Sequence, residues 1–179
     1  AINAASNTDS ILVWPGLYDE TLDFDGKEIV VSSLYFIAND SLLIESTILD
    51  ANGNGSVVSF ASGESNESIL QGFTIQNGNY VLGSGIVSNS AATVENCIIR
   101  FNQASYGGGI YQVGGDGLGL NISETHFCGN TPNDIEGPWN DAGGNTFDVS
   151  CENNSCSADV NGDGNVNVAD VLAILSSWG

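Results

Sequence analysis

The sequence predicts an all-β solenoid, a chain wound into stacked coils of short strands, followed by a short C-terminal loop and helix. Three observations lead to this fold class. Apolar pairs recur 24 residues apart, such as Leu70 with Val94 and Gly85-Ile86 with Gly109-Ile110. Before Val168, no run of ten or more residues shows the apolar period of a helix. The chain also has 23 glycines and only 3 prolines, which implies many sharp turns.

Each copy of the 24-residue repeat contains two short strand-like segments. In the first copy these are Leu70–Ile75 and Gly85–Ser88, and in the second they are Val94–Ile99 and Gly109–Gln112. One such unit cannot bury its own apolar face, whereas stacked units can. A fixed period carried by short apolar runs is typical of repeat architectures. The expected inward residues are Phe73, Ile75, Cys97 and Ile99.

The preceding elements follow from local patterns. Residues Ala1–Asp9 are expected to form a short, partly helical segment or part of a first turn. Turn signals at Pro15-Gly16, Asp25-Gly26 and Asn52–Gly55 separate apolar or alternating runs. The strand-like runs are Ile11–Trp14, Thr21–Phe24, Ile29–Val31, Leu42–Leu49 and Val57–Phe60.

The repeat continues on both sides with a variable period. Leu49 aligns with Ile75 at a spacing of 26, and Phe127 aligns with Ile99 at a spacing of 28. Such variation is expected where the strands are constant and insertions lie in surface turns. Asparagines also follow several strand ends. Stacked coils would let them form a hydrogen-bonded ladder, and isolated turn asparagines are an equal alternative. They are Asn77, Asn102 and Asn130.

The charge balance is extreme, with 2 Lys+Arg against 22 Asp+Glu and a net charge of −20. Nucleic acid is a poor partner because its binding depends on neutralising phosphates with Lys or Arg. Anionic membranes are disfavoured for the same reason, and no stretch reaches the roughly 18 apolar residues of a membrane span. The chain repels itself unless salt or divalent cations screen it. A medium with calcium or much salt is therefore expected, and a merely solubilising acidic surface is the alternative.

The four cysteines fall into two groups. Cys97 takes the inward position that Phe73 fills one repeat earlier, so it is expected to be a buried small hydrophobe. The other three are Cys128, Cys151 and Cys156, and an exported protein would form one disulfide among them, with Cys128–Cys151 as the first choice. No CxxC pair occurs, so zinc is not expected. No signal peptide is visible and the chain has no methionine, so we expect a processed or truncated chain.

The most informative motif is DVNGDGNVNVAD at residues 159–170. Oxygen-bearing side chains fall at six of its positions, and Gly164 permits a sharp turn. Calcium takes six to eight oxygen ligands, so the motif predicts a calcium site. The predicted ligands are Asp159, Asn161, Asp163, Asn165 (through its backbone carbonyl), Asn167 and Asp170. The apolar face of the helix that follows comprises Val168, Val171, Leu172, Leu175 and Trp178. A flexible polar tail is the alternative.

The repeats resemble secreted bacterial proteins with the right-handed parallel β-helix, or pectate-lyase-like, fold. The resemblance covers roughly residues 9–149 and implies about five to six coils within residues 1–150. It says nothing about activity, because this fold hosts lyases, hydrolases, adhesins and structural repeats alike. The matching stretches are DSILVWPGLYDETLDFDGKEIVV, STILDANGNGSVVSF, ILQGFTIQNG, VENCIIRFN, YGGGIY and FCGNTPNDIEGPWNDAGGNTF.

The calcium motif resembles one repeat of a dockerin, a bacterial relative of the EF-hand that commonly has Asp at position 12. The resemblance implies a half dockerin at residues 159–179, after a linker at residues 151–158. Dockerins carry two such repeats and only one is present here, so tight cohesin binding of the usual kind is not expected. A lone loop and helix cannot bury its apolar face. We therefore expect the Trp178 face to dock on the end of the β-helix or on another molecule.

Catalysis has little support in the sequence. Lyases on this fold need a Lys or Arg base, and the only candidates are Lys27, expected to be solvated in a turn, and Arg100, expected to point outward. Hydrolases need a pair of carboxylates. His126 is expected to be a surface or hydrogen-bonded histidine. The acids that lie near strands are best explained by chance in so acidic a chain: Asp19, Glu20, Asp23, Asp25 and Asp50.

The sequence therefore predicts a non-catalytic, calcium-binding structural or cell-surface module that is secreted. Its partners would be another protein or a second copy, joined through the β-helix ends and the Trp178 face. Head-to-tail contacts of this kind give filaments when the rotation does not close. One alternative is a carbohydrate-active hydrolase or lyase. The other is a module that binds glycans, or that attaches to a protein as cohesin partners do.

Overall fold

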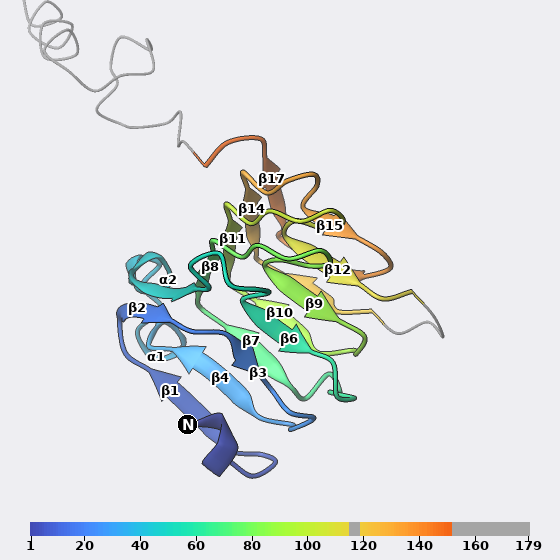
Figure 1. Cartoon of the computed structure of the whole chain (residues 1–179). Helices are drawn as coiled ribbons and strands as arrows, with labels where there is room; N and C mark the ends of the chain where they lie inside the picture. The colour runs from blue at the N-terminus through green and yellow to red at the C-terminus, as the bar shows by residue number, and fades with distance from the viewer. Residues whose placement is uncertain (115–118, 152–179) are drawn as a thin grey trace, which may run out of the picture.

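The computed structural model describes residues 1–114 and 119–151, and it shows an all-β parallel β-helix. Three parallel sheets run along the solenoid (Figure 1). Sheet A contains β1 (Ser10–Val13), β4 (Val30–Ser33), β7 (Ile69–Gln71), β10 (Thr93–Glu95), β13 (Asn121–Ser123) and β16 (Asn140–Gly143). Sheet B contains β2 (Gly16–Asp19), β5 (Thr47–Asp50), β8 (Thr74–Gln76), β11 (Ile98–Arg100), β14 (His126–Cys128) and β17 (Thr146–Asp148). Sheet C contains β3 (Leu22–Asp23), β6 (Val58–Phe60), β9 (Ile86–Ser88), β12 (Ile110–Gln112) and β15 (Ile135–Glu136).

Each coil contributes one strand to each sheet. Five coils have all three strands, and β16 and β17 form a sixth, which confirms the predicted five to six coils. The predicted alignments are also confirmed, because Leu49 pairs with Ile75, and Ile99 pairs with Phe127. Figure 1 shows the coils stacked from β1 near the N-terminus to β17 at the opposite end.

The first strand-like segment of each repeat was predicted as one piece, and this is wrong. Leu70–Ile75 divides into β7 and β8 around a corner at Gly72-Phe73. Gly72 has φ +80°, and a Cβ there would collide with Ser33 Oγ. The sequence already contained the reason, since inward residues of one strand are two apart. Leu70 and Phe73 are three apart, a spacing that a regular strand does not allow and that a corner or a bulge provides.

The second correction concerns the run Leu42–Leu49. Its first half is a short helix, α2 (Leu42–Ser46), and only Thr47–Asp50 forms a strand. Short apolar runs do not distinguish a buried helix from a strand. Here the Asp40 carboxylate accepts a hydrogen bond from the Leu42 N–H at 3.0 Å and starts the turn. In the part of the chain that the structure describes, the remaining helices are η1 (Ile2–Ala4), which fits the partly helical start, and α1 (Tyr35–Ala38).

The core is a set of columns in which residues of successive coils lie over one another. In sheet B, the column passes through Leu49, Ile75, Ile99 and Phe127, all of which are buried. The corner residues Phe73 and Cys97 point into the same core. In-register parallel pairing places each apolar side chain over its counterpart, so one repeat pattern builds the whole interior. None of the helices in the described residues is long and apolar enough to cross a membrane.

Candidate functional site

The predicted calcium site lies outside the described residues. This applies to all its ligands, namely Asp159, Asn161, Asp163, Asn165, Asn167 and Asp170, and to the Trp178 helix face. The linker and half-dockerin boundaries lie there too, apart from Cys151. Within residues 1–114 and 119–151, no three His, Cys, Asp or Glu side chains are placed to hold a metal ion. The chemistry of the motif, six oxygen donors around a glycine turn, still fits a hard cation such as calcium.

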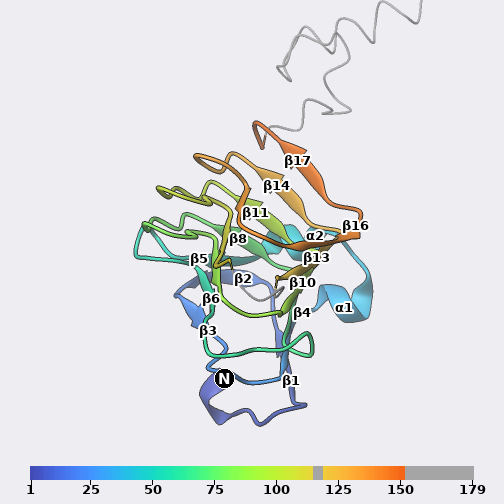
Figure 2. The ribbon, with the colours of Figure 1, turned by 90° about the vertical axis from the view of Figure 1, so that its right-hand side faces the viewer.

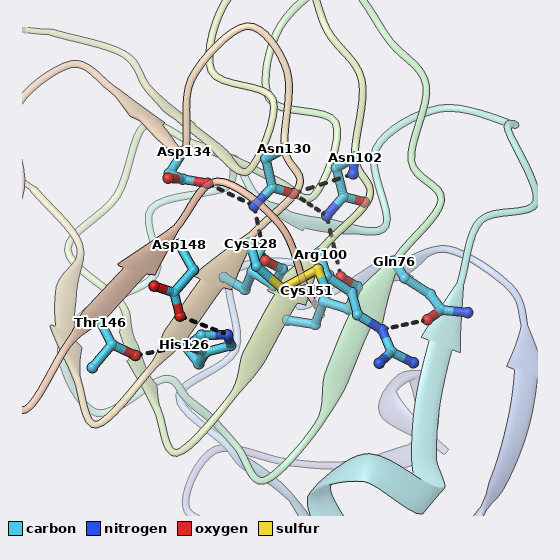
Figure 3. Close-up of a disulfide and its surroundings, with 12 residues drawn as sticks. Gln76, Arg100, Asn102, His126, Cys128, Asn130, Asp134, Thr146, Asp148 and Cys151 are labelled. Carbon is cyan, nitrogen blue, oxygen red and sulfur yellow. Dashed lines mark hydrogen bonds and ion pairs between the residues drawn. A yellow bond between two sulfur atoms is a disulfide. The ribbon is translucent and has the colours of Figure 1, made fainter. Parts of the chain in front are cut away.

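A row of polar side chains crosses the outer face of sheet B. Gln76 Nε2 donates to Asp50 Oδ2 at 2.9 Å, and Arg100 Nε donates to Gln76 Oε1 at 2.9 Å. The Arg100 guanidinium also lies 5.8 Å from the centre of the Phe101 ring. Arg100 therefore points outward, as predicted, and its row joins three successive coils. Figure 3 shows the contact between Arg100 and Gln76 in this row.

The Cys128–Cys151 disulfide lies next to this row, which confirms the first-choice pairing. It ties Cys151, which follows the last strand β17, back to β14. Cys97 is free and buried, as predicted, and burial raises its pKa to about 12. Because a thiolate is the reactive form of cysteine, Cys97 is a packing residue and not a nucleophile.

His126 contacts two side chains of the last strand (Figure 3). Its Nδ1 lies 2.7 Å from Thr146 Oγ1, and its Nε2 lies 3.7 Å from Asp148 Oδ2. Hydroxyl, imidazole and carboxylate thus occur in the order that a nucleophile, a base and an orienting acid require. Asp148, however, is 64% exposed, so water competes for its contact. The histidine is hydrogen-bonded, as the sequence predicted.

Glu64 is a buried carboxylate that no sequence pattern pointed to. It is 3% exposed and accepts hydrogen bonds from Gly26 N–H, Ser62 N–H and Ser90 Oγ, at 2.9, 3.0 and 2.7 Å. Burial alone would raise its pKa, but the bonds from Ser90 and from backbone N–H groups outweigh burial and lower the pKa. The donors lie in the turns that end coils one, two and three. Glu64 therefore joins three coils while ionised.

The acids near the first strands behave in a similar way. Burial would raise the pKa of Asp50, but hydrogen bonds from Gln76, the Asn52 N–H and Asn77 lower it. Asp23 Oδ1 accepts a hydrogen bond from the Asp25 N–H at 2.8 Å, which shapes the turn. Hydrogen bonds of this kind, within turns and between coils, give these two carboxylates structural roles.

Lys27 differs from the expectation of a solvated side chain. Its Nζ donates to the carbonyl oxygens of Ile2 at 2.7 Å and Asn3 at 3.2 Å. It thereby anchors η1, and Ile2 packs into the core at the first coil. The only lysine of the chain is used to attach the N-terminal segment to the solenoid.

The asparagine ladder exists in part. Asn102 Nδ2 donates to Asn130 Oδ1 and to the Ile75 carbonyl, both at 3.1 Å, and Asn102 Oδ1 accepts from Gly78 N–H at 2.9 Å. Asn102 is 1% exposed, so these bonds replace all its contacts with water. Asn77 does not belong to the ladder, because it donates to Asp50 instead. The one-residue shift in its position explains the difference.

The inner columns are less well covered at the two ends of the described solenoid. At the first coil, a cavity of about 410 Å³ opens between η1 and the first strands. At the last coil, Phe147 stacks on Phe127 with ring centres 4.9 Å apart, yet it is 48% exposed. The cavity is lined in part by Ile2, Ile11, Val13, Tyr18, Leu22 and Phe73.

A further pocket lies on the loops between sheets B and C, where Asn79 and Gln103 form a parallel bridge. It is about 380 Å³ in volume. Bridges on either side, to Gly55 and Thr131, extend the contact over four coils, and we call this set of positions the loop ladder. Figure 2 shows these loops stacked along one edge of the solenoid. Sequence reasoning missed the site, although the 24-residue spacing of Asn79 and Gln103 was a signal for it. The pocket is lined by Asn79, Tyr80, Val81, Gln103, Ala104 and Ser105.

Comparisons of the chain with protein-family profiles, with curated proteins and with solved structures found no significant match.

Proposed function

We propose that the protein is a non-catalytic structural module of the extracellular or cell-surface space. One observation carries this proposal. Among residues 1–114 and 119–151, the two carboxyl groups with shifted pKa values are Glu64 and Asp50, and in both the pKa is lowered by hydrogen bonds, several of which come from a neighbouring coil. A catalytic acid needs the opposite shift, towards the working pH. Glu64 and Asp50 hold neighbouring coils together through hydrogen bonds.

The chemistry of the chain supports an extracellular site. The chain has a disulfide, Cys128–Cys151. Disulfides persist in oxidising compartments and are rare in the cytosol. The net charge of −20 suits a medium rich in salt or divalent cations. The motif at residues 159–170 would add calcium binding there, through the six ligands named above.

Calcium titration of the full chain by calorimetry tests the metal part of this proposal. Asp163→Ala removes one predicted carboxylate ligand and should weaken calcium binding at least tenfold. Asp19→Ala is the matched control, because it removes the same charge from an exposed strand residue. Equal calcium affinity in both variants would show that the acidic surface binds calcium diffusely, without a dedicated loop.

The non-catalytic part is tested on polysaccharides. The purified chain, incubated with neutral and acidic polysaccharides, should release neither reducing ends nor unsaturated products. Sustained turnover that is lost in His126→Ala or in Arg100→Ala would instead support the hydrolase or lyase alternative.

The proposal includes association through the two ends of the solenoid. A second copy, or another segment of polypeptide, would bury the cavity at the first coil and the exposed ring of Phe147. Asp141 opposes direct stacking of the last coil on the first coil of a second copy. It pairs with Ile122, which lies in a buried column, so stacking would place a carboxylate in the contact between the two copies. We therefore expect self-association to need calcium. Light scattering in calcium and then in EDTA measures it, and monomers under both conditions would exclude it.

A further inference from the structure

Charged residues are missing from three consecutive segments of the solenoid. Residues 51–63, 77–94 and 101–114 contain no Asp, Glu, Lys or Arg. At the chain's 13% charged content, 45 residues would carry about six charged side chains. Each segment consists mainly of a strand of sheet C and the loop before it, so the segments lie one above another in coils two, three and four. We call this surface the uncharged face.

The uncharged face comprises a strip of sheet C and the part of the loop ladder that lies in coils two to four, at Gly55, Asn79 and Gln103. On the strip, Ser59, Val87 and Tyr111 are in register, and the neighbours beyond them are Asp23 and Glu136. The charged residues thus begin where the face ends. The loop ladder contributes the 380 Å³ pocket, which no carboxylate and no cation lines.

The backbone of the pocket is held in place. Asn79 N–H donates to Gly55 O at 3.0 Å, and Gln103 N–H donates to Gly78 O at 2.9 Å. The Tyr80 N–H donates to Ser84 Oγ at 2.8 Å, and this hydroxyl also reaches the Gln103 carbonyl. The loops are therefore ordered before any ligand arrives, which lowers the entropic cost of binding.

The side chains of the pocket, in contrast, are free for a ligand. The amides of Asn79 and Gln103 and the hydroxyls of Tyr80 and Ser105 make no hydrogen bond to any other described residue. Amides on the neighbouring ladders are bonded, as Gln76 and Asn102 show. Tyr80 and Tyr106 are each 57% exposed. An ordered backbone with unbonded amide and phenol groups is the arrangement of a binding surface.

The chemistry of this surface selects a ligand class. An aromatic ring offers an apolar face together with a polar edge, and amides offer both donors and acceptors. Sugars match this combination, with apolar C–H faces and ring hydroxyls. An acidic sugar would find no cation on the face and would be repelled by the net charge of −20. Equivalent positions repeat about every 4.8 Å from coil to coil, which suits an extended polymer.

We propose that the uncharged face binds a neutral polysaccharide, with Tyr80 and Gln103 as central contacts. This adds a ligand to the scaffold proposed above and does not depend on its calcium loop. Failure here would leave the calcium and turnover tests unaffected.

Affinity electrophoresis of the full chain in EDTA tests the proposal. The gels contain hydroxyethyl cellulose, mixed-linkage β-glucan or galactomannan as neutral probes, and polygalacturonate as the acidic probe. At least one neutral polymer should retard the protein, and polygalacturonate should not. Tyr80→Ala and Gln103→Ala should each raise the dissociation constant for that polymer about tenfold or more.

Trp14→Ala is the control, because Trp14 is 71% exposed on the corner between β1 and β2, away from the uncharged face. It should leave retardation unchanged. Circular dichroism and the melting temperature should match the parent chain in all three variants, since no described residue is hydrogen-bonded to the Tyr80 or Gln103 side chain. The proposal is overturned if no neutral polymer retards the chain, if polygalacturonate retards it equally, or if the Trp14 variant loses as much affinity as the Tyr80 variant.

Discussion

Replacing Glu64 with glutamine tests whether buried hydrogen bonds between coils stabilise the solenoid. The carboxylate accepts three hydrogen bonds, from donors in three successive turns: Gly26, Ser62 and Ser90. Glutamine keeps the shape of the side chain but puts an NH₂ group in place of one oxygen. In one orientation this group meets the Ser62 N–H, and in the other it meets the Gly26 N–H. Either way, one backbone donor loses its acceptor and the remaining bonds lose their charge.

The size of the effect follows from these contacts. An unsatisfied buried donor costs about 1–3 kcal/mol, and a hydrogen bond to a charged group contributes about 1.5–3 kcal/mol. We therefore expect Glu64→Gln to lower the free energy of unfolding by about 2–4 kcal/mol at neutral pH. Urea titration followed by circular dichroism measures this. Glu67→Gln is the matched control, since Glu67 is exposed and should change stability by less than about 0.5 kcal/mol.

The effect of Glu64 should also depend on pH. Its folded pKa lies below its ordinary value of 4.5, so the unfolded chain takes up this proton more readily than the folded chain. The ionised group therefore stabilises the fold above 4.5, and that contribution is lost as the pH falls through the folded pKa. The stability gap between parent and Glu64→Gln should be constant near neutrality and should narrow in acid. Equal losses for Glu64→Gln and Glu67→Gln, or a gap that persists in acid, would refute the reasoning.

Three further perturbations examine other parts of the solenoid. Asn102→Ala leaves the Gly78 N–H and the Ile75 carbonyl without their partner, so it should cost about 2–4 kcal/mol in urea titration. The control Asn66→Ala should cost less than about 0.5 kcal/mol, because Asn66 is exposed and its side chain is hydrogen-bonded to no described residue; equal losses would contradict the ladder. The double variant Cys128→Ser/Cys151→Ser opens a link that spans 23 residues and should cost about 3 kcal/mol, with faster hydrogen exchange first in β16 and β17. Cys97, with its pKa raised by burial to about 12, should resist iodoacetamide in the native chain and react only in urea, as peptide mass mapping would show.

The repeat made most of the fold predictable. Residues 24, 26 and 28 apart pair in the sheets, because in-register stacking requires an inward residue at each equivalent position. The wrong predictions concern local secondary structure. The corner at Gly72 was missed because the inward residues Leu70 and Phe73 were read as one strand. The helix α2 was missed because its three apolar residues, Leu42, Leu43 and Ile44, fit a strand and a helix equally well.

The candidate sites were less predictable, for a different reason. Lys27 was expected to be solvated, and only the folded chain shows that η1 returns to place two carbonyls against it. Glu64 accepts a hydrogen bond from Ser90, 26 residues further along the chain, and neither residue type predicts this contact. In the sequence, Asn79 and Gln103 look like ordinary turn residues. Only the structure shows that they pair with each other in a parallel β-bridge.

By itself, the sequence determined the solenoid and its coil number, and it made Cys128–Cys151 the first choice of disulfide; the calcium motif stays a prediction. Each of these depends on residue type and spacing, which are visible along the chain. Only the tertiary structure decided which polar groups meet: Glu64 with three turns, Asn102 with Asn130, and the uncharged loops with one another. Loop lengths differ from coil to coil, so these partners are fixed only when the coils close and stack. The physical reason is that apolar packing needs only a pattern, whereas a hydrogen bond needs a particular partner at a particular distance.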